Sequence, residues 1–176
     1  MAEEISVLIS EEDLDKRISE MGEQISRDYE GQEVHLICVL KGATFFMCEL
    51  AKRITIPVSI DFMSVSSYGN STKSSGVVKI IKDLDKPLDG QNVIVVEDII
   101  DTGRTLSYLL KVLEQRGPAS VKLATMLDKP DRRVVDDVVV DYTGFEIPDE
   151  FVVGYGLDYA EKYRNLPYIG VLHISE

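Results

Sequence analysis

The chain has 176 residues, 44% hydrophobic and 28% charged, values that fit one packed α/β domain and exclude an intrinsically disordered chain. The net charge of -12, from 19 Lys and Arg against 31 Asp and Glu, disfavours a general nucleic-acid binder. A small phosphorylated ligand stays compatible with this charge, because backbone N–H groups and one bound cation can reverse the field locally.

The first predicted helix begins at Ser10 and ends at about Tyr29. Ser10 opens a Ser-x-x-Asp capping pattern that closes at Asp13. One apolar helical face follows, formed by Leu14, Ile18, Met21 and Ile25. The continuous apolar run 34–40 then predicts a buried strand, after which Thr44 is expected to cap a second helix.

Two more strands are predicted at 57–65 and 77–81, separated by a long polar spacer. Residues 66–76 are rich in Ser, Gly and Asn, and Tyr68 is their one apolar anchor. The spacer is too long for a tight hairpin turn. It is consistent with either a solvated hairpin tip or an active-site lid.

The remaining elements complete an alternating pattern. A buried strand is predicted at 92–96, then a helix ending at Gly117-Pro118, then a strand at 120–127. The inner face of that helix carries Leu106, Leu109, Leu110 and Leu113. From Val138 we expect short strands and turns that form a lobe over one sheet edge. This alternation predicts a mostly parallel twisted sheet flanked by helices, with ligands at the carboxyl ends of its strands.

The cysteines and the first residues bear on the cell compartment. Cys38 and Cys48 lie in apolar stretches without C-x-x-C spacing, so we expect both to be reduced core residues. The start of the sequence is acidic, unlike a signal peptide. Its apolar runs also fall short of the roughly 18 residues that span a bilayer. These features predict a cytoplasmic protein without membrane contact.

The segment 93–106 carries the strongest chemical signal. A buried strand leads directly into Glu97, Asp98 and Asp101, followed by the Thr-Gly-Arg-Thr turn 102–105. Such a turn brings backbone N–H groups and two hydroxyls to the start of a helix, which predicts a phosphate site. Acids beside it suit sugar hydroxyls, a hard cation such as Mg²⁺, or proton transfer. A shorter Thr-Gly turn alone would indicate only a capped helix beside solvated acids.

The full segment resembles the phosphoribosyl-diphosphate motif of the purine phosphoribosyltransferases. Other segments resemble landmarks of the hypoxanthine-guanine phosphoribosyltransferase family, in the family's order and over nearly the whole chain. They are Leu40-Lys41-Gly42, Ser67-Tyr68, Leu127-Asp128-Lys129-Pro130, Phe151-Val152-Val153-Gly154-Tyr155 and Leu157-Asp158-Tyr159 with Arg164.

The resemblance implies a fold and an activity. The fold would be the type I phosphoribosyltransferase fold, one domain over 1–176, with a hood lobe from the N-terminal segment and about 151–176. The activity would be Mg²⁺-dependent transfer of the 5-phosphoribosyl group from 5-phosphoribosyl 1-diphosphate to hypoxanthine or guanine. Its products would be IMP or GMP and diphosphate, as in purine salvage. A homodimer or homotetramer is the assembly that the family implies.

The resemblance also implies roles for the acids. Glu97 and Asp98 would hold the ribose hydroxyls directly or through Mg²⁺, with Asp158 as a further metal-side carboxylate. Asp101 would be catalytic, exchanging a proton with the five-membered ring of the purine. The chemistry agrees, since a purine nitrogen attacks better as its other ring proton is withdrawn, and carboxylates stabilise a cationic sugar.

The phosphate groups would be held from three places. The 5-phosphate would be bound by Asp101, Thr102, Gly103, Arg104 and Thr105. Arg104 occupies a position where the family often has Lys. The Lys41-Gly42 backbone would face the diphosphate, and this peptide can be cis in the family. Arg164 would bind the diphosphate, and Ser67-Tyr68 would close over it within a lid at 66–76.

The base would be recognised by three residues. Lys129 would donate to the purine 6-oxo group, which selects oxopurines over adenine. Phe151 would stack on the purine, and the Val152 backbone would accept from the amino group of guanine. Without the resemblance, we would interpret Lys129 as a surface lysine in a turn and Phe151 as a core residue. His35 and His173 match no landmark and are interpreted as structural.

Other functions fit parts of the same pattern. A regulator of this fold could bind phosphoribosyl diphosphate without catalysis, but the charge of -12 offers no basic surface for nucleic acid. A phospho-acceptor signalling domain is disfavoured, because its acidic pair would follow the first strand. A transferase that prefers xanthine remains open.

Overall fold

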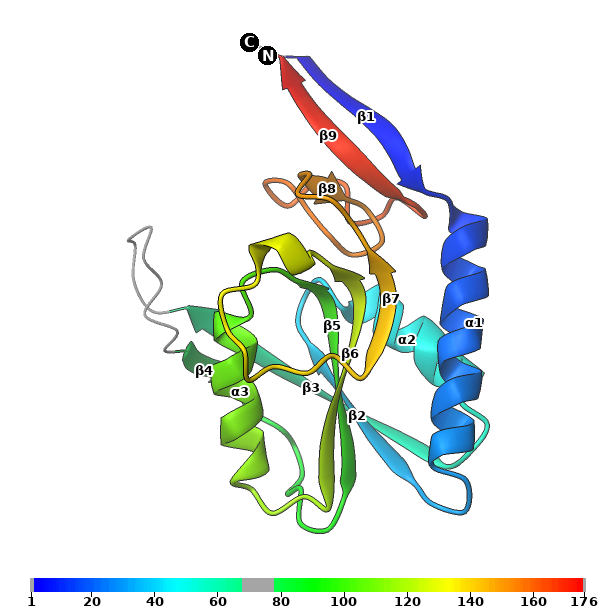
Figure 1. Ribbon diagram of the computed structural model, residues 1–176, viewed down its shortest axis with the longest axis vertical. Helices are drawn as coiled ribbons and strands as arrows, with labels where there is room; N and C mark the ends of the chain where they lie inside the picture. Colours follow the sequence, from blue (N-terminus) through cyan, green and yellow to red (C-terminus); the bar gives the residue numbers. More distant parts are fainter. Residues whose placement is uncertain (1, 68–77, 176) are drawn as a thin grey trace.

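A computed structural model of the chain describes residues 2–67 and 78–175 (Figure 1). Tyr68 and most of the expected lid at 66–76 lie outside these residues. In chain order the elements are β1 (Ala2–Ile9), α1 (Glu11–Asp28), β2 (Val34–Val39), α2 (Thr44–Arg53), β3 (Val58–Ser67), β4 (Val78–Lys82), β5 (Asn92–Ile100), α3 (Arg104–Glu114), β6 (Ser120–Asp128), the short 3-10 helix η1 (Pro130–Arg132), β7 (Tyr142–Glu146), β8 (Val152–Val153) and β9 (Ile169–Ser175).

The described strands form one large mixed sheet and one small antiparallel sheet. The large sheet has the order β4-β3-β2-β5-β6-β7. All of its neighbours pair in parallel except β3 and β4. The predicted α/β class with a mostly parallel sheet is therefore confirmed. The carboxyl ends of β2, β5 and β6 consequently meet at one edge of the sheet.

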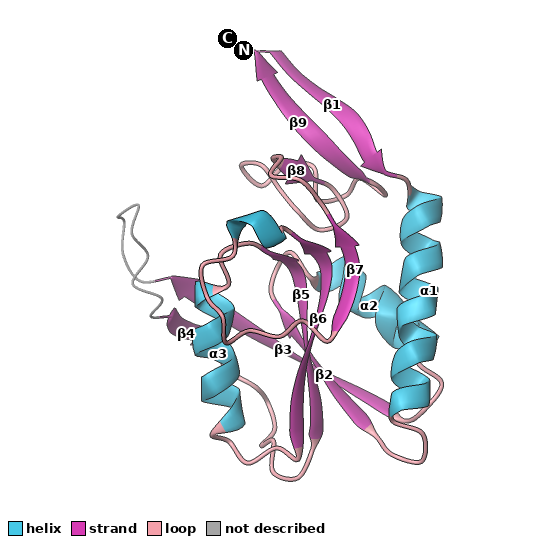
Figure 2. Ribbon diagram, viewed as in Figure 1, coloured by secondary structure: helices cyan, strands magenta, loops and turns pink. Residues whose placement is uncertain are grey.

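Helices cover both faces of this sheet (Figure 2). Every residue of β2 is buried, because alternate side chains enter two separate cores. Leu36 and Cys38 pack in the core that contains the apolar residues of α1 and α2. Ile37 and Val39 pack in the second core, with the leucines of α3. This two-sided burial explains the uninterrupted apolar run of β2.

The helix starts test the two predicted caps. The hydroxyl oxygen of Ser10 accepts from the Asp13 backbone N–H at 3.1 Å, which confirms the cap of α1. The expected cap of α2 is wrong, since Ala43 is the N-cap residue. The Thr44 hydroxyl instead donates to the Lys41 carbonyl at 2.7 Å, so it stabilises the turn before the helix.

One cysteine differs from its prediction. Cys38 is buried in β2, but Cys48 is exposed on α2. Phe46, Met47 and Leu50 form the buried face of that helix, and Cys48 falls on the opposite side of the helical repeat. The apolar neighbourhood in the sequence therefore did not indicate its burial.

A strand pair that the sequence pattern did not predict joins the two ends of the chain. β1 pairs with β9 in antiparallel register, and β9 pairs with the short β8. The ribbon of β1 and β9 extends beyond the rest of the molecule, with both termini at its tip (Figure 1). We call β1 together with residues 151–175 the hood. Within its ribbon of β1 and β9, Ser6 Oγ and His173 Nε2 lie 2.9 Å apart.

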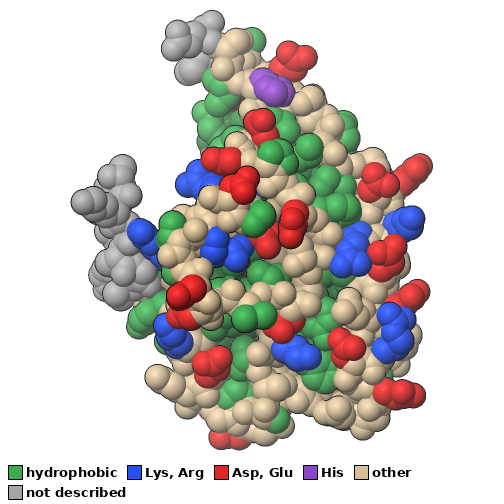
Figure 3. All heavy atoms as spheres, in the orientation of Figure 1, with side chains coloured by type: hydrophobic (Ala, Val, Ile, Leu, Met, Phe, Trp, Pro, Cys, Tyr) green, Lys and Arg blue, Asp and Glu red, His purple; other side chains and the backbone are tan. Residues whose placement is uncertain are grey.

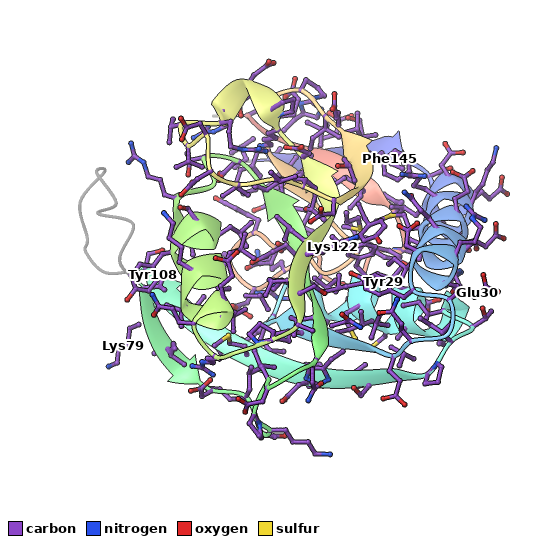
Figure 4. The ribbon with its side chains drawn as sticks, turned by 60° about the horizontal axis from the view of Figure 1, so that its bottom comes forward. Tyr29, Glu30, Lys79, Tyr108, Lys122 and Phe145 are labelled. Carbon is purple, nitrogen blue, oxygen red and sulfur yellow. The ribbon has the colours of Figure 1, made fainter. Side chains whose placement is uncertain are left out.

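Two tyrosine rings contact a lysine side chain between α1 and the large sheet. Lys122 Nζ lies 5.1 Å from the ring centroid of Tyr29 and 5.8 Å from that of Tyr142. Figure 4 shows Lys122 and Tyr29 facing each other. The Tyr142 hydroxyl donates to Asp28 Oδ2 at 2.7 Å. These contacts attach the end of α1 to β6 and β7.

His35 is a buried structural residue of β2. Its side chain lies 2.6 Å from Ser59, measured between Nδ1 and Oγ, and its Nε2 is buried without a hydrogen-bond partner among the described residues. Burial lowers the pKa of His35, with Asp61 opposing the shift and Lys86 adding to it. At pH values just below 6.5, the folded protein therefore keeps the His35 imidazole neutral, whereas an unfolded chain would protonate it.

We expect the free energy of unfolding to fall as the pH drops below about 6.5, because only the unfolded state then gains a proton at His35. The slope approaches about 1.4 kcal/mol per pH unit for one such group. Urea unfolding at pH 7, 6 and 5 measures it. His35→Gln should flatten the slope, whereas His173→Gln, on the exposed ribbon, should not. An equal slope in wild type and His35→Gln would contradict this.

Candidate active site

The predicted site residues gather where β2, β5 and β6 end. Lys41 and Gly42 follow β2, and Lys129 follows β6. β5 continues through the acids to Ile100, whereas the sequence pattern predicted its end at Val96. The extension arises because Ile100 still pairs with Asp128 in β6. The strand pairing therefore brings the acidic end of β5 beside Lys129.

Two neighbouring carboxylates form the most strongly perturbed group in this region. Burial, together with the charge of Asp98, raises the pKa of Glu97 well above its usual range. Burial also raises the pKa of Asp98, whose Oδ1 accepts from the Ile99 backbone N–H at 2.7 Å. The charge of Arg164 and the Ile99 N–H lower the pKa of Asp98 but do not cancel the effect of burial. A cation or hydroxyl donors would stabilise the ionised pair.

Glycine at position 42 is required by this carboxylate pair. A Cβ atom built on Gly42 would lie 1.8 Å from Asp98 Oδ2. The cis peptide bond lies one residue earlier than the resemblance implied, between Leu40 and Lys41. On its other side, the Gly42 carbonyl oxygen would lie 2.1 Å from a Cβ atom on Gly156 in the hood. The turn after β2 is therefore packed tightly between β5 and the hood.

The predicted phosphate loop lies at the start of α3. Asp101 is exposed, and its Oδ1 accepts from the Thr102 backbone N–H at 2.6 Å. Gly103 adopts a left-handed φ of 80° as the N-cap of α3, a conformation that suits glycine. A cavity of about 170 Å³ is lined by Glu97, Ile99, Ile100, Asp101, Thr102, Gly103, Thr105 and Leu106. The backbone N–H groups and positive end of α3 favour an anion there. Arg104 is exposed as the first residue of the helix.

Arg164 and Asp158 form a separate charged pair in the hood. Arg164 donates through Nη1 to the Gly156 carbonyl at 2.8 Å, and its Nη2 lies 3.3 Å from Asp158 Oδ1. Asp158 Oδ2 accepts from the Glu161 backbone N–H at 2.8 Å. Lys41 Nζ approaches Glu161 Oε2 at 3.4 Å. The hood loop is thus joined to the turn after β2.

The three predicted metal ligands do not form a complete cage. Across residues 2–67 and 78–175, no three His, Cys, Asp or Glu side chains gather closely enough to hold a metal by themselves. Glu97 and Asp98 are neighbours, but Asp158 is engaged with Arg164. Mg²⁺ commonly uses one or two carboxylates and completes its shell with phosphate oxygens and waters. The acidic pair fits such an ion only together with its substrate.

The residues that the sequence predicts for base recognition are Lys129, Phe151 and Val152. The Lys129 side chain is only 12% exposed, and its Nζ lies 3.5 Å from Asp149 Oδ1. Phe151 is 53% exposed, so it is not the core residue that its sequence alone suggests. Its ring meets Tyr159 edge to face, with centroids 5.8 Å apart. Val152 is buried in β8. Phe151 therefore offers free ring surface to a planar ligand.

Two features complete the comparison with the predicted site. Ser67 ends β3 and is exposed, whereas its partner Tyr68 lies outside the described residues. Arg133 was not predicted, although it donates to the Asp101 carbonyl at 3.0 Å and to the Asp128 carboxylate. Nothing in the local sequence separates Arg133 from the neighbouring Arg132. Its contacts depend on the pairing of β5 with β6.

A mostly parallel sheet with paired acids and a glycine turn at the start of a helix at one edge, beside a small antiparallel sheet, is typical of a type I phosphoribosyltransferase. A sequence model of the phosphoribosyl transferase domain family matches residues 10–160. The hypoxanthine-guanine phosphoribosyltransferase of Streptococcus thermophilus is 55% identical over 166 residues, covering 94% of this chain and 92% of that protein. A crystal structure of the Bacillus anthracis hypoxanthine-guanine phosphoribosyltransferase has a TM-score of 0.92 and 53% identity, covering 96% of this chain and 99% of that one.

The chain belongs to the phosphoribosyltransferase family, and the relatives that it covers almost completely are hypoxanthine-guanine phosphoribosyltransferases. The resemblance found in the sequence is therefore confirmed. The chain also matches the bifunctional protein TilS/HprT of Listeria monocytogenes with 58% identity, where it spans 94% of its own length but only 26% of that protein.

Proposed function

We propose that this chain transfers the 5-phosphoribosyl group from 5-phosphoribosyl 1-diphosphate to hypoxanthine or guanine, with Mg²⁺ as cofactor, giving IMP or GMP and diphosphate. One observation carries the proposal. Glu97 and Asp98, whose pKa values burial raises, border the same edge of the sheet as the cavity at the start of α3 and the largely buried Lys129 side chain. An activated sugar phosphate and a planar base satisfy all three features together.

The loop at the start of α3 binds the 5-phosphate. Its backbone N–H groups and the hydroxyls of Thr102 and Thr105 border a cavity that suits one phosphate group. Glu97 and Asp98 accept hydrogen bonds from the ribose hydroxyls and stabilise positive charge as it develops on the sugar. Mg²⁺ would be held by these two carboxylates and the substrate, with Asp158 as a further metal-side acid, and would supply positive charge to the departing diphosphate.

Asp101 exchanges the proton of the reaction. It is exposed at the cavity, and its Oδ1 is oriented by the Thr102 backbone N–H. Its carboxylate withdraws the proton from one nitrogen of the five-membered ring while the other attacks the sugar carbon. The bond between the sugar and the diphosphate breaks in the same step, and the Lys41-Gly42 backbone and Arg164 bind the departing diphosphate.

Lys129 selects the base. An ammonium group donates to a 6-oxo group but cannot accept from the 6-amino group of adenine. Burial of all but 12% of the side chain restricts water as a competing partner. Phe151 stacks on the purine, and the Val152 backbone accepts from the guanine amino group. Xanthine also carries a 6-oxo group, so a preference for xanthine is the second candidate.

The remaining proposals concern cellular context. A regulator that contacts nucleic acid would need a basic surface. On the face in Figure 3, Lys and Arg are interspersed with Asp and Glu and form no continuous basic patch among the described residues.

No described helix combines the length and apolar character required to cross a membrane. We propose a cytoplasmic homodimer or homotetramer that acts on small molecules.

Nucleotide formation with Mg²⁺, phosphoribosyl diphosphate and each of four bases tests the function. We expect absorbance changes that report IMP and GMP from hypoxanthine and guanine, lost with a chelator and restored by excess Mg²⁺. Adenine should give no turnover, because it lacks a partner for Lys129. Activity on xanthine alone would overturn the choice of base. Binding of phosphoribosyl diphosphate without turnover on any base would favour the regulator.

Asp101→Asn tests the proton exchange. The substitution keeps the size of the side chain but removes its basicity, so kcat should fall about a hundredfold or more. The Kd for phosphoribosyl diphosphate, measured by calorimetry with Mg²⁺, should change little. As a control, Asp89→Asn alters an exposed acid outside the site and should leave kcat unchanged. Unchanged turnover in Asp101→Asn would remove Asp101 from this role.

A further inference from the structure

Arg133 joins the ends of β5 and β6. The guanidinium Nε donates to the Asp101 carbonyl at 3.0 Å, and Nη2 donates to the Asp128 carboxylate. The Arg133 side chain is 19% exposed and that of Asp128 only 10%. The pair is thus largely removed from water, where a charge-assisted hydrogen bond is stronger and more directional than at the surface.

Backbone hydrogen bonds extend this connection on both sides. The Lys129 N–H donates to the Ile100 carbonyl at 2.9 Å, and the Val134 N–H donates to the Thr102 carbonyl at 3.1 Å. Arg133 supplies the middle bond, to Asp101. The three consecutive carbonyls at the end of β5 are therefore all held by the segment that follows β6.

The stem of Arg133 also packs against the phosphate loop. A Cβ atom built on Gly103 would lie 3.0 Å from Arg133 Cδ and 2.7 Å from Val135 Cγ2. The loop therefore approaches the Arg133 side chain as closely as a glycine permits. A side chain without this stem would leave the loop less well packed, independently of charge.

We propose that Arg133 is a positioning residue that fixes the distance between Asp101 and Lys129. This inference rests on the proposed function, in which the two residues contact different rings of one rigid, planar purine. Asp128 directly precedes Lys129, and the other contact of Arg133 is the backbone of Asp101 itself. The guanidinium of one arginine therefore holds both the backbone of Asp101 and the residue before Lys129. A lysine at this position, with a single ammonium group, would hold only one of them.

The test compares Arg133→Gln and Arg133→Lys with Arg116→Gln. Arg116 is a matched control, because its guanidinium donates to Asp83 at 2.7 and 3.0 Å, away from the site, with a side chain 30% exposed. We expect kcat for IMP formation to fall about ten- to a hundredfold in both Arg133 variants, since small misplacements of reacting groups cost about that much. The KM for phosphoribosyl diphosphate should stay within about threefold.

Stability is measured alongside, so that unfolding is not mistaken for misplacement. All variants are assayed where circular dichroism shows them folded, and Arg133→Lys retains a charge opposite Asp128. A loss of kcat no larger than in Arg116→Gln would overturn the proposal. An equal rise of both substrate KM values at unchanged kcat would also overturn it, since that pattern indicates weaker binding rather than misplacement.

A double-mutant cycle with Asp128→Asn examines the same connection. If Arg133 acts from its anchor on Asp128, Asp128→Asn should lower kcat, and the double variant should be no slower than Arg133→Gln alone. Multiplicative losses would mean independent roles and contradict the proposal. The activity of the wild type distinguishes failure of the proposed function from failure of the positioning role. An inactive wild type overturns the proposed function. An active wild type with an unaffected Arg133→Gln overturns only the positioning role.

Discussion

Two adjacent carboxylates at the end of a buried central strand carry a desolvation cost that the protein offsets only in part. Burial raises the pKa of both Glu97 and Asp98, and the charge of Asp98 adds to the shift of Glu97, whereas the Ile99 N–H and the charge of Arg164 oppose the shift of Asp98 without cancelling it. A sequence under selection for stability alone would replace them with apolar side chains. Under the proposed function, these acids and the cavity at the start of α3 together bind a ligand that brings both cationic and phosphate groups.

The rest of the molecule is arranged around the edge of the large sheet where β2, β5 and β6 end. Parallel pairing of β5 with β6, through Ile100 and Asp128, brings together Asp101 and Lys129, the proposed proton acceptor and the proposed base-recognition lysine. The turn after β2 approaches Asp98 so closely that only glycine fits. The hood adds Arg164 and the exposed ring of Phe151 from above. Arg133 connects the two strand ends, which in our proposal sets the spacing of Asp101 and Lys129 for a rigid purine.

Local patterns in the sequence predicted what depends on neighbours along the chain. The Ser10 cap, the buried strands and the loop after β5 are signals of this kind, and the structure contains them. Features that depend on distant pairing were missed. β1 is a strand because β9 lies beside it, and β5 extends to Ile100 because β6 continues to pair with it. Arg133 and the exposed Cys48 likewise depend on which face or strand they meet, which local composition does not encode.

Calorimetric titration of phosphoribosyl diphosphate, with Mg²⁺ and with a chelator, tests the central claim that the acidic pair is completed by a metal-bound substrate. We expect binding at least about tenfold weaker in chelator, where the carboxylates and the diphosphate repel each other. Mg²⁺ alone should bind weakly, since no complete cage exists among the described residues. Equal affinity with and without Mg²⁺ would contradict the account.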